Sequence, residues 1–328
     1  MRWLDLPETD QRRLFEQIAF QTGLLPQAVE KDAWVTLVLR VLFISETGRH
    51  LTFKGGTSLS KVYRLIKRFS EDIDLAIDRE YLGFGGDLTK GKIRKLRRAS
   101  HTFVAEKLPE IIRRGMTAIG VPETLYQIRV PNTEISDQDP EKLEVLYPSV
   151  FDEVPYLPSR VMVEMGARSQ GEPFDVKPIS SFIDMHYAAQ SFAEKPFEIK
   201  VIRPERTFLE KLILLHEEFS KPTEKIRHFR MSRHYYDIAQ ILDTTYGQRA
   251  LKDEELFRKI IRHRRIFTPV KSVDYDGLTL ETLQIIPPPP VLDLYKADYK
   301  RMQETMIFGN AMDFEEILEK LGKIGTKK

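Results

Sequence analysis

The sequence predicts a core of mixed strands and helices, preceded by helices and followed by a helical domain. Residues 1–45 carry apolar side chains at helical spacing, as a packed helix does. Between Leu51 and Met165, short alternating segments typical of strands interrupt the helical ones. Helical periodicity returns beyond about Ile202. Strands mixed with helices over about 150 residues are typical of an α+β or α/β core.

We therefore expect N-terminal helices over 1–45, a mixed core over 46–201 and a helical C-terminal domain over 202–328. Hydrophobic residues make up 41% of the chain and charged residues 30%, which is typical of a globular protein. The absence of cysteine excludes disulfides, zinc–thiolate sites and cysteine nucleophiles. No apolar stretch approaches the ~18 residues of a membrane span, so we expect a cytoplasmic protein without a membrane partner.

The N-terminal half predicts several elements. Val29–Phe43 is apolar enough to be a buried helix, in which Lys31 and Asp32 would need partners. The chain then predicts a strand, a helix and a half-buried strand, over Leu51–Phe53, Leu59–Ile66 and Asp72–Ile77. A basic helix is expected over Lys90–Arg114, strands over Leu125–Val130, Lys142–Tyr147 and Arg160–Met165, and a loop over Pro131–Glu141.

The C-terminal part predicts helices. Pro204 is well placed to open a helix that continues to Phe219. Further helices are expected over Arg233–Leu242, Glu254–Arg265 and Phe314–Leu321. Residues 287–290 are four prolines, which we interpret as a rigid connector.

The strongest local pattern is Gly55-Gly56-Thr57-Ser58, followed by Asp72-x-Asp74. Glycines before a helix let a phosphate approach backbone N–H groups, and the two hydroxyls can add donors. A glycine pair is more often only a turn, and an Asp-x-Asp pair is more often a solvated strand face. Together, in this order and at this spacing, they are more specific.

Asp72 and Asp74 are two apart in a predicted strand, so their carboxylates project to one face. Two adjacent carboxylates repel unless a cation lies between them, and hard oxygen ligands suit Mg²⁺. Glu164, in an otherwise apolar run, is a candidate third acid or a strand-end acid facing water. Arg168 can bind phosphate or pair with Glu164.

The helical half adds Lys211 and Asp237. Lys211 lies on the margin of an apolar stripe, where it either snorkels or reaches into a cleft. On spacing alone, Asp237 is expected to pair with Arg233 along its helix. Two basic clusters, Lys90–Arg98 and Arg258–Arg265, are either solvated helix faces or surfaces for nucleic acid.

Phe53–Lys61 and Phe69–Leu75 resemble the AbiEii/AbiGii toxin family, which includes the MenT toxins. These are nucleotidyltransferases of the DNA polymerase β-like superfamily. The resemblance continues through Val163–Met165, Glu205–Lys211, Arg233–Ile238 and the segment from Asp298 to Ile307. It covers most of the chain, rests on four ordered motifs, and implies an α+β nucleotidyltransferase core with a mixed sheet flanked by helices.

The resemblance also implies roles. A nucleoside triphosphate would be bound by Gly55, Gly56, Thr57 and Ser58, with Lys61 nearby. From their positions in the sequence, near Asp72 and Glu164, we add Ser70 and Arg168 as candidate nucleotide-binding residues. Mg²⁺ or Mn²⁺ would be held by Asp72, Asp74 and Glu164. Catalysis would involve Asp72 and Asp74 with Lys211 and Asp237, which come from the helical domain and complete the active site. Ser70 matches a serine that an antitoxin kinase phosphorylates in some relatives, so we expect a cognate antitoxin.

The favoured hypothesis is a toxin that adds a nucleotide to RNA, with the tRNA 3′ end as the expected acceptor, and blocks translation. A second hypothesis keeps the chemistry but replaces the acceptor by a small molecule or a protein hydroxyl. A third is a non-enzymatic interaction protein on the same scaffold. The presence of Asp72, Asp74 and Lys211 argues against the third.

Overall fold

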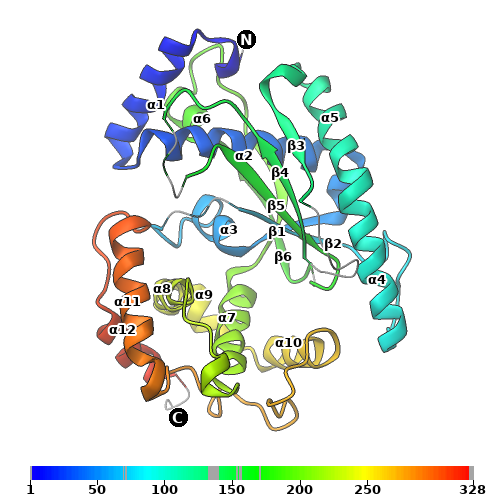
Figure 1. The fold of residues 1–328 in the computed structure, drawn as a ribbon, viewed down its shortest axis with the longest axis vertical. Helices are drawn as coiled ribbons and strands as arrows, with labels where there is room; N and C mark the ends of the chain where they lie inside the picture. The colour runs from blue at the N-terminus through cyan, green and yellow to red at the C-terminus, as the bar shows by residue number, and fades with distance from the viewer. Residues whose placement is uncertain are drawn as a thin grey trace. The chain divides into compact units, whose positions relative to one another are not determined.

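The computed structural model describes residues 2–68, 70, 72–131, 140–152, 154, 157–169 and 171–324. The chain forms two units, and its fold is mixed α+β, as the resemblance implies (Figure 1). The first unit comprises Met1–Val62 and Ser70–Ile202, and the second comprises Tyr63–Phe69 and Arg203–Lys328. The predicted loop at Pro131–Glu141 falls largely outside the described residues.

The first unit is built on a mixed sheet. Within the described residues, seven strands form it in the order β3-β4-β5-β2-β1-β7-β6. Their bounds are Leu51–Lys54 (β1), Ile73–Ile77 (β2), Gln127–Arg129 (β3), Glu141–Leu146 (β4), Arg160–Gly166 (β5), Phe174–Ile179 (β6) and Phe197–Ile202 (β7). β2 pairs in parallel with β5, and β1 pairs in parallel with β7, whereas the other neighbours are antiparallel.

Helices flank this sheet. They are α1 (Glu8–Thr22), α2 (Pro26–Ile44), α3 (Gly55–Lys61), α4 (Lys90–Thr102), α5 (Leu108–Ala118) and α6 (Phe182–His186). A π-helical segment, Phe103–Lys107, joins α4 to α5 in one long rod, and short 3₁₀ turns cover Trp3–Asp5, Glu46–His50 and Glu123–Leu125 (Figure 1). α2 crosses the sheet and packs on β5, α1 and α5, which explains why it is apolar on nearly every side.

The charges inside α2 have partners, as predicted. Lys31 Nζ donates to the carbonyl of Pro158 at 2.9 Å. Asp32 forms an ion pair with Lys61 and accepts from the backbone N–H of Phe182 at 2.8 Å. These contacts satisfy charges that would otherwise be costly to bury.

One prediction about the first unit was wrong in its bounds, and two strands were not predicted. The helix predicted over Leu59–Ile66 begins at Gly55 and ends at Lys61. The chain that follows this helix leads to Arg68, which forms a β-bridge with Ile307. β6 and β7 were not predicted. β6 contains Pro178, which lowers the strand signal and is tolerated because β6 is at the edge of the sheet.

The second unit is helical. Its helices are α7 (Pro204–Phe219), α8 (Ser232–Leu242), α9 (Thr245–Ala250), α10 (Glu254–Phe267), α11 (Pro289–Thr305) and α12 (Phe314–Gly322), with a 3₁₀ turn at Thr223–Lys225. α7 packs against α8, α9 and α10 and is buried along most of its length. No described helix combines the length and the hydropathy that a membrane span requires.

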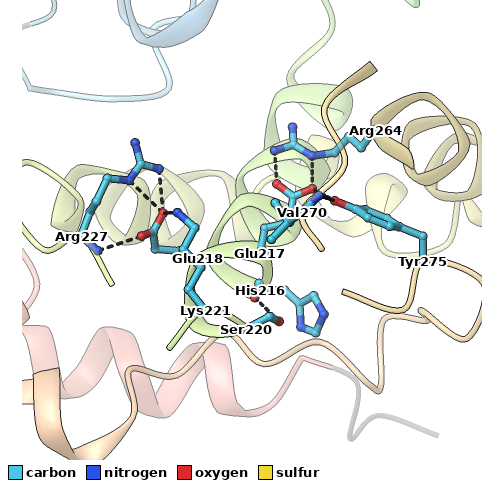
Figure 2. A network of polar contacts seen from close by, with 9 residues as sticks. All are labelled: His216, Glu217, Glu218, Ser220, Lys221, Arg227, Arg264, Val270 and Tyr275. Atoms are coloured by element: carbon cyan, nitrogen blue, oxygen red, sulfur yellow. Dashed lines mark hydrogen bonds and ion pairs between the residues drawn. The ribbon is translucent and has the colours of Figure 1, made fainter. Parts of the chain in front are cut away.

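Two buried carboxylates and their partners fix the C-terminal half of α7 (Figure 2). Glu217 accepts from Arg264 Nε of α10 at 2.8 Å and from the Tyr275 hydroxyl at 2.6 Å. Glu218 accepts from Arg227, through its backbone N–H at 2.7 Å and its guanidinium at 2.7 Å. Glu217 therefore attaches α10 and the loop that contains Tyr275 to α7, and Glu218 attaches the loop that contains Arg227.

The proline run is not simply a connector. Pro289 and Pro290 form the first turn of α11, where a missing N–H costs nothing. The prediction of a rigid connector over all four prolines was therefore wrong at its second half.

The segment Tyr63–Arg68, which we name the strap, lies in sequence between α3 and β2 but belongs to the second unit. Arg68 forms an antiparallel bridge with Ile307, and the carbonyl of Lys67 accepts from Phe308 N–H at 2.8 Å. The N–H of Lys67 donates to the hydroxyl of Tyr236 at 3.1 Å. A single domain boundary near residue 202 would place the strap in the first unit, whereas the strap belongs to the second unit.

Candidate active site

The glycine pair forms the turn from β1 into α3. Gly55 has φ +80°, and a Cβ at this position would lie 1.9 Å from Oδ2 of Asp74. Glycine is therefore required at position 55 for two reasons: the left-handed backbone conformation and the close approach of the Asp74 carboxylate. The sequence thus folds so that the Gly55 backbone and the Asp74 carboxylate lie against each other.

The hydroxyls of Thr57 and Ser58, which follow the glycine pair, are hydrogen-bonded within the protein. Ser58 is fully buried and donates to the carbonyl of Gly55 at 2.8 Å. Thr57 is buried and donates to the Ser70 hydroxyl at 2.9 Å. These bonds fix the turn and connect it to Ser70, so the side chains support the turn rather than extend outward as donors.

Asp72 and Asp74 flank Ile73 at the start of β2. Ile73 and Leu75 are fully buried, whereas both aspartates remain partly exposed, as the alternation predicts. The two carboxylates therefore leave the sheet on the face opposite the buried side chains.

A row of charges crosses four neighbouring strands at Asp74. Asp74 of β2 is the register partner of Lys54 on β1 and of Glu164 on β5, and Glu164 is the partner of Lys142 on β4. Register partners share a face of the sheet, so these four side chains project together. Lys142 Nζ lies 2.8 Å from Glu164 Oε1.

Three carboxylates, those of Asp72, Asp74 and Glu164, are the candidate ligands for a divalent cation. Among the described residues, no group of three or more His, Asp or Glu side chains is arranged to hold a metal. Asp72 and Asp74 still offer two carboxylates on one face, and the Asp74 carboxylate lies against the backbone of Gly55. That set fits Mg²⁺, which takes one or two carboxylates together with substrate phosphates. Glu164 lies beside Asp74 but pairs with Lys142, so the pair of aspartates is the better-supported ligand set.

Two further predicted nucleotide-binding residues are placed in the first unit. Lys61, at the end of α3, forms a buried ion pair with Asp32, so its ammonium already has a structural partner. Arg168 follows the end of β5 and is partly exposed.

The second unit contains a buried cluster of four charged or polar side chains. Asp237 of α8 is fully buried and accepts two hydrogen bonds from Arg68, at 2.6 Å from Nε and 2.8 Å from a terminal nitrogen. Lys211 Nζ of α7 lies 3.0 Å from Asp237 Oδ2 and 3.3 Å from His234 Nδ1. We name Arg68, Lys211, His234 and Asp237 the α7–α8 cluster.

Burial and neighbouring charge shift the pKa of each group in this cluster. Desolvation lowers the pKa of Lys211, an effect that Asp237 partly offsets. Desolvation also lowers the pKa of His234 well below its ordinary value, and the positive charge of Lys211 adds to it. Burial would raise the pKa of Asp237, but Arg68 and Lys211 outweigh it and hold that pKa well below its usual range. These shifts favour the anionic form of Asp237 and the neutral form of His234.

The start of α8 is held by the C-terminal segment. Asp298 of α11 is buried and accepts from the backbone N–H groups of Arg230 and Ser232, at 2.8 and 3.0 Å. Arg230 has φ +58°, a conformation that side-chain-bearing residues rarely adopt. Asp298 therefore fixes the turn that leads into His234 and Asp237.

The two basic clusters lie on helices with one buried face. Ile93 and Leu96 of α4 are buried, whereas most cations between Lys90 and Arg98 are exposed. On α10, Arg258 and Arg262 are exposed. Arg264 differs, because it is bonded to Glu217.

The family model for the nucleotidyl transferase AbiEii toxins of type IV toxin–antitoxin systems matches residues 37–320. The chain belongs to this AbiEii family. It is therefore a toxin-type nucleotidyltransferase, with a nucleotide as substrate and an antitoxin as partner. The match spans α3 and β2 of the first unit and α7, α8 and α11 of the second. A search of the curated proteins finds no match.

Sequence reasoning missed two residues of this AbiEii-family protein. Arg68 was given no role, although it lies just before the segment that contains Ser70 and Asp72. His234 was part of a quoted motif but was also given no role. The expected helical neighbour of Asp237 was Arg233, whereas the structure provides two partners from distant segments, Arg68 and Lys211.

Proposed function

We propose that the protein transfers a nucleoside monophosphate from a nucleoside triphosphate to RNA, with the tRNA 3′ end as acceptor, and so blocks translation. The observation that carries this proposal is the contact between the Gly55 turn and Asp74, next to Asp72. In a nucleotidyltransferase family, this arrangement is suited to a triphosphate and its cation.

The chemistry is an in-line displacement. The 3′-hydroxyl of the acceptor attacks the α-phosphorus and a new P–O bond forms. The bond from the α-phosphorus to the bridging oxygen breaks, pyrophosphate leaves, and the proton of the hydroxyl passes to water. Mg²⁺ or Mn²⁺ held by Asp72 and Asp74 would offset the charge that develops on the phosphates.

In the first unit, the backbone N–H groups of Gly55 and Gly56 are proposed to bind phosphate oxygens. Thr57 and Ser58 support that turn through their own hydrogen bonds. In the second unit, Lys211 is proposed to bind the triphosphate, because a desolvated ammonium interacts strongly with phosphate. Asp237 keeps that ammonium in place.

The acceptor is proposed to be RNA because exposed cations gather on α4 and α10. Phosphate contacts from such cations supply much of the affinity for nucleic acid. Nucleoside triphosphates and tRNA are found together in the cytoplasm, where we propose that the protein acts.

Ser70 is proposed as the point at which an antitoxin controls activity. Its hydroxyl already accepts from Thr57 of the Gly55 turn, and it is close in sequence to Asp72. A negative charge there would repel the triphosphate. Ser70→Asp should therefore be inactive, whereas Ser70→Ala, which removes the hydroxyl without adding charge, should retain most transfer in the same assay. Full activity of Ser70→Asp would remove Ser70 from the site.

One experiment tests the proposed function directly. The protein is incubated with each α-labelled triphosphate, Mg²⁺ and total RNA, and the labelled species are separated. We expect label on tRNA with the wild type and none with Asp72→Asn or Asp74→Asn. Label on protein or on small molecules, with none on RNA, would replace the acceptor, and equal labelling by the Asp72→Asn variant would overturn the metal assignment.

A further inference from the structure

The ammonium of Lys211 has two acceptors in the α7–α8 cluster. One is Oδ2 of Asp237, 3.0 Å away, and the other is Nδ1 of His234, 3.3 Å away. An ammonium carries three hydrogens, so these two acceptors account for two of them. The side chain of Lys211 is 11% exposed, and the two contacts leave one hydrogen of its ammonium for a further acceptor.

His234 must act as the acceptor in this contact. An ammonium can only donate, so Nδ1 must carry a lone pair and the ring proton must lie on Nε2. A protonated imidazole would instead place a positive charge against Lys211, and Arg68 and Arg233 add to that positive field. Burial acts in the same direction, so the neutral ring is the stable form.

Asp237 alone leaves Lys211 poorly fixed. A lysine side chain has four rotatable carbons, and a single carboxylate oxygen restrains its end in distance but hardly in direction. Arg68 binds both oxygens of Asp237 and so fixes the carboxylate itself. The contact with His234, one turn earlier on the same helix, supplies the second direction for the ammonium.

We propose that His234 is a positioning residue that holds the Lys211 ammonium between its Nδ1 and Asp237 and leaves one N–H for a phosphate of the substrate. This inference rests on the proposed function, because it assumes that Lys211 binds the triphosphate. It predicts that tight triphosphate binding requires a hydrogen-bond acceptor at position 234 and does not require an imidazole ring.

The first test compares triphosphate binding by calorimetry, and KM and kcat, in three variants. His234→Ala removes the acceptor, and His234→Asn keeps one, because its amide oxygen can take the place of Nδ1. Tyr235→Phe is the matched control: its buried hydroxyl donates to the carbonyl of Ile285 at 2.6 Å and has no contact with Lys211.

We expect His234→Ala to weaken triphosphate binding about tenfold, which corresponds to one charge-assisted hydrogen bond. His234→Asn should restore most of that loss, and Tyr235→Phe should match the wild type. Equal losses in His234→Ala and His234→Asn, or no loss in either, would overturn the proposal.

The second test does not depend on activity or on the stability of His234→Ala. ¹⁵N NMR of the imidazole in the intact protein should show an unprotonated Nδ1 and a protonated Nε2 at neutral pH, and Lys211→Met should shift the Nδ1 resonance. The His234→Asn spectrum identifies the signal by its absence. An imidazolium, or a proton on Nδ1, would refute the contact. If the NMR result holds but Lys211→Ala leaves triphosphate affinity unchanged, then the role assigned to Lys211 fails instead.

Discussion

Asp237 binds two buried cations of the second unit. Its side chain has no exposed surface, and Arg68 and Lys211 both bind it. Removing one partner from a buried ion pair leaves the other charge uncompensated in a medium of low dielectric constant. The cost is therefore much larger than that of a surface pair.

We expect Asp237→Asn to lower the free energy of unfolding by about 3–5 kcal/mol. The matched control is Asp243→Asn, just beyond the end of the same helix, where Asp243 is 63% exposed and pairs with Lys320. That surface pair should contribute only about 0–1 kcal/mol. Urea unfolding of both variants measures the difference, and equal losses would contradict the assignment of Asp237 as the centre of the α7–α8 cluster.

Gly55 is constrained by its backbone and by its neighbour. Gly55→Ala would introduce a left-handed residue, which costs about 1–2 kcal/mol, and would also push against Asp74 Oδ2. Gly83→Ala separates the two effects, because Gly83 has φ +86° but nothing lies within 4 Å of its added Cβ.

We therefore expect a larger loss of stability in Gly55→Ala than in Gly83→Ala, and loss of nucleotidyl transfer only in Gly55→Ala. Thermal unfolding and the labelled-triphosphate assay provide the two measurements. If Gly55→Ala were as active as Gly83→Ala, then the approach of the turn to Asp74 would have no role in transfer.

At the scale of elements, α10 has two different kinds of arginine. Arg264 is held by Glu217, and its loss would disturb the attachment of α10 to α7. Arg258 and Arg262 are exposed and can be replaced without breaking a buried contact. A test of RNA binding must therefore use the exposed residues and leave Arg264 in place.

If α10 binds RNA, the variant with both Arg258→Ala and Arg262→Ala should transfer nucleotides to tRNA less well at low salt. Its activity should also fall less steeply as salt rises, because fewer counterions are released. The control carries Lys300→Ala and Arg301→Ala, the same change of charge on exposed positions of α11. Identical rates and salt slopes in the two variants would exclude α10 as an RNA surface and favour a small acceptor.

The elements that the sequence predicts well have strong local patterns. α2 is apolar on nearly every side, α7 opens with Pro204, and β2 is an apolar strand interrupted by the partly exposed Asp74. β7 also alternates, with Ile199 and Val201 buried, so its omission was a missed signal rather than a missing one. β6 gave a weaker signal, because it lies at the edge and contains Pro178.

The candidate site was predictable only in part, for a physical reason. The Gly55 turn and the paired aspartates lie within one short segment of the sequence. There the glycine pair predicts a turn, and the Asp-x-Asp spacing predicts that both carboxylates share one face of a strand. The bond between Arg68 and Asp237 joins residues 169 apart, and no periodicity connects them. His234 could be located in a motif, but its role depends on the packing of α8 against α7.

At the scale of the whole molecule, the strap makes the second unit discontinuous in sequence. Residues 203–328 lack Arg68 and Lys67, so Asp237 and the Tyr236 hydroxyl lose partners. A fragment of residues 203–328 should therefore be about 3–5 kcal/mol less stable than one supplied with the missing cation.

We expect that fragment to unfold at lower urea than it does when a synthetic peptide of residues 62–70 is added. The same peptide with Arg68→Ala should have little effect. A fragment that unfolds cooperatively and at the same urea concentration with or without the peptide would show that the strap is dispensable.

The bridge between Arg68 and Ile307 also sets the order in which the protein can mature on the ribosome. Residues 67 and 68 are synthesised long before their backbone partners at Ile307 and Phe308. The Asp237 carboxylate is likewise made long after the strap. The ribosome must therefore make α8 before the α7–α8 cluster can form, and it must go on to Phe308 before the backbone contacts of the strap are complete.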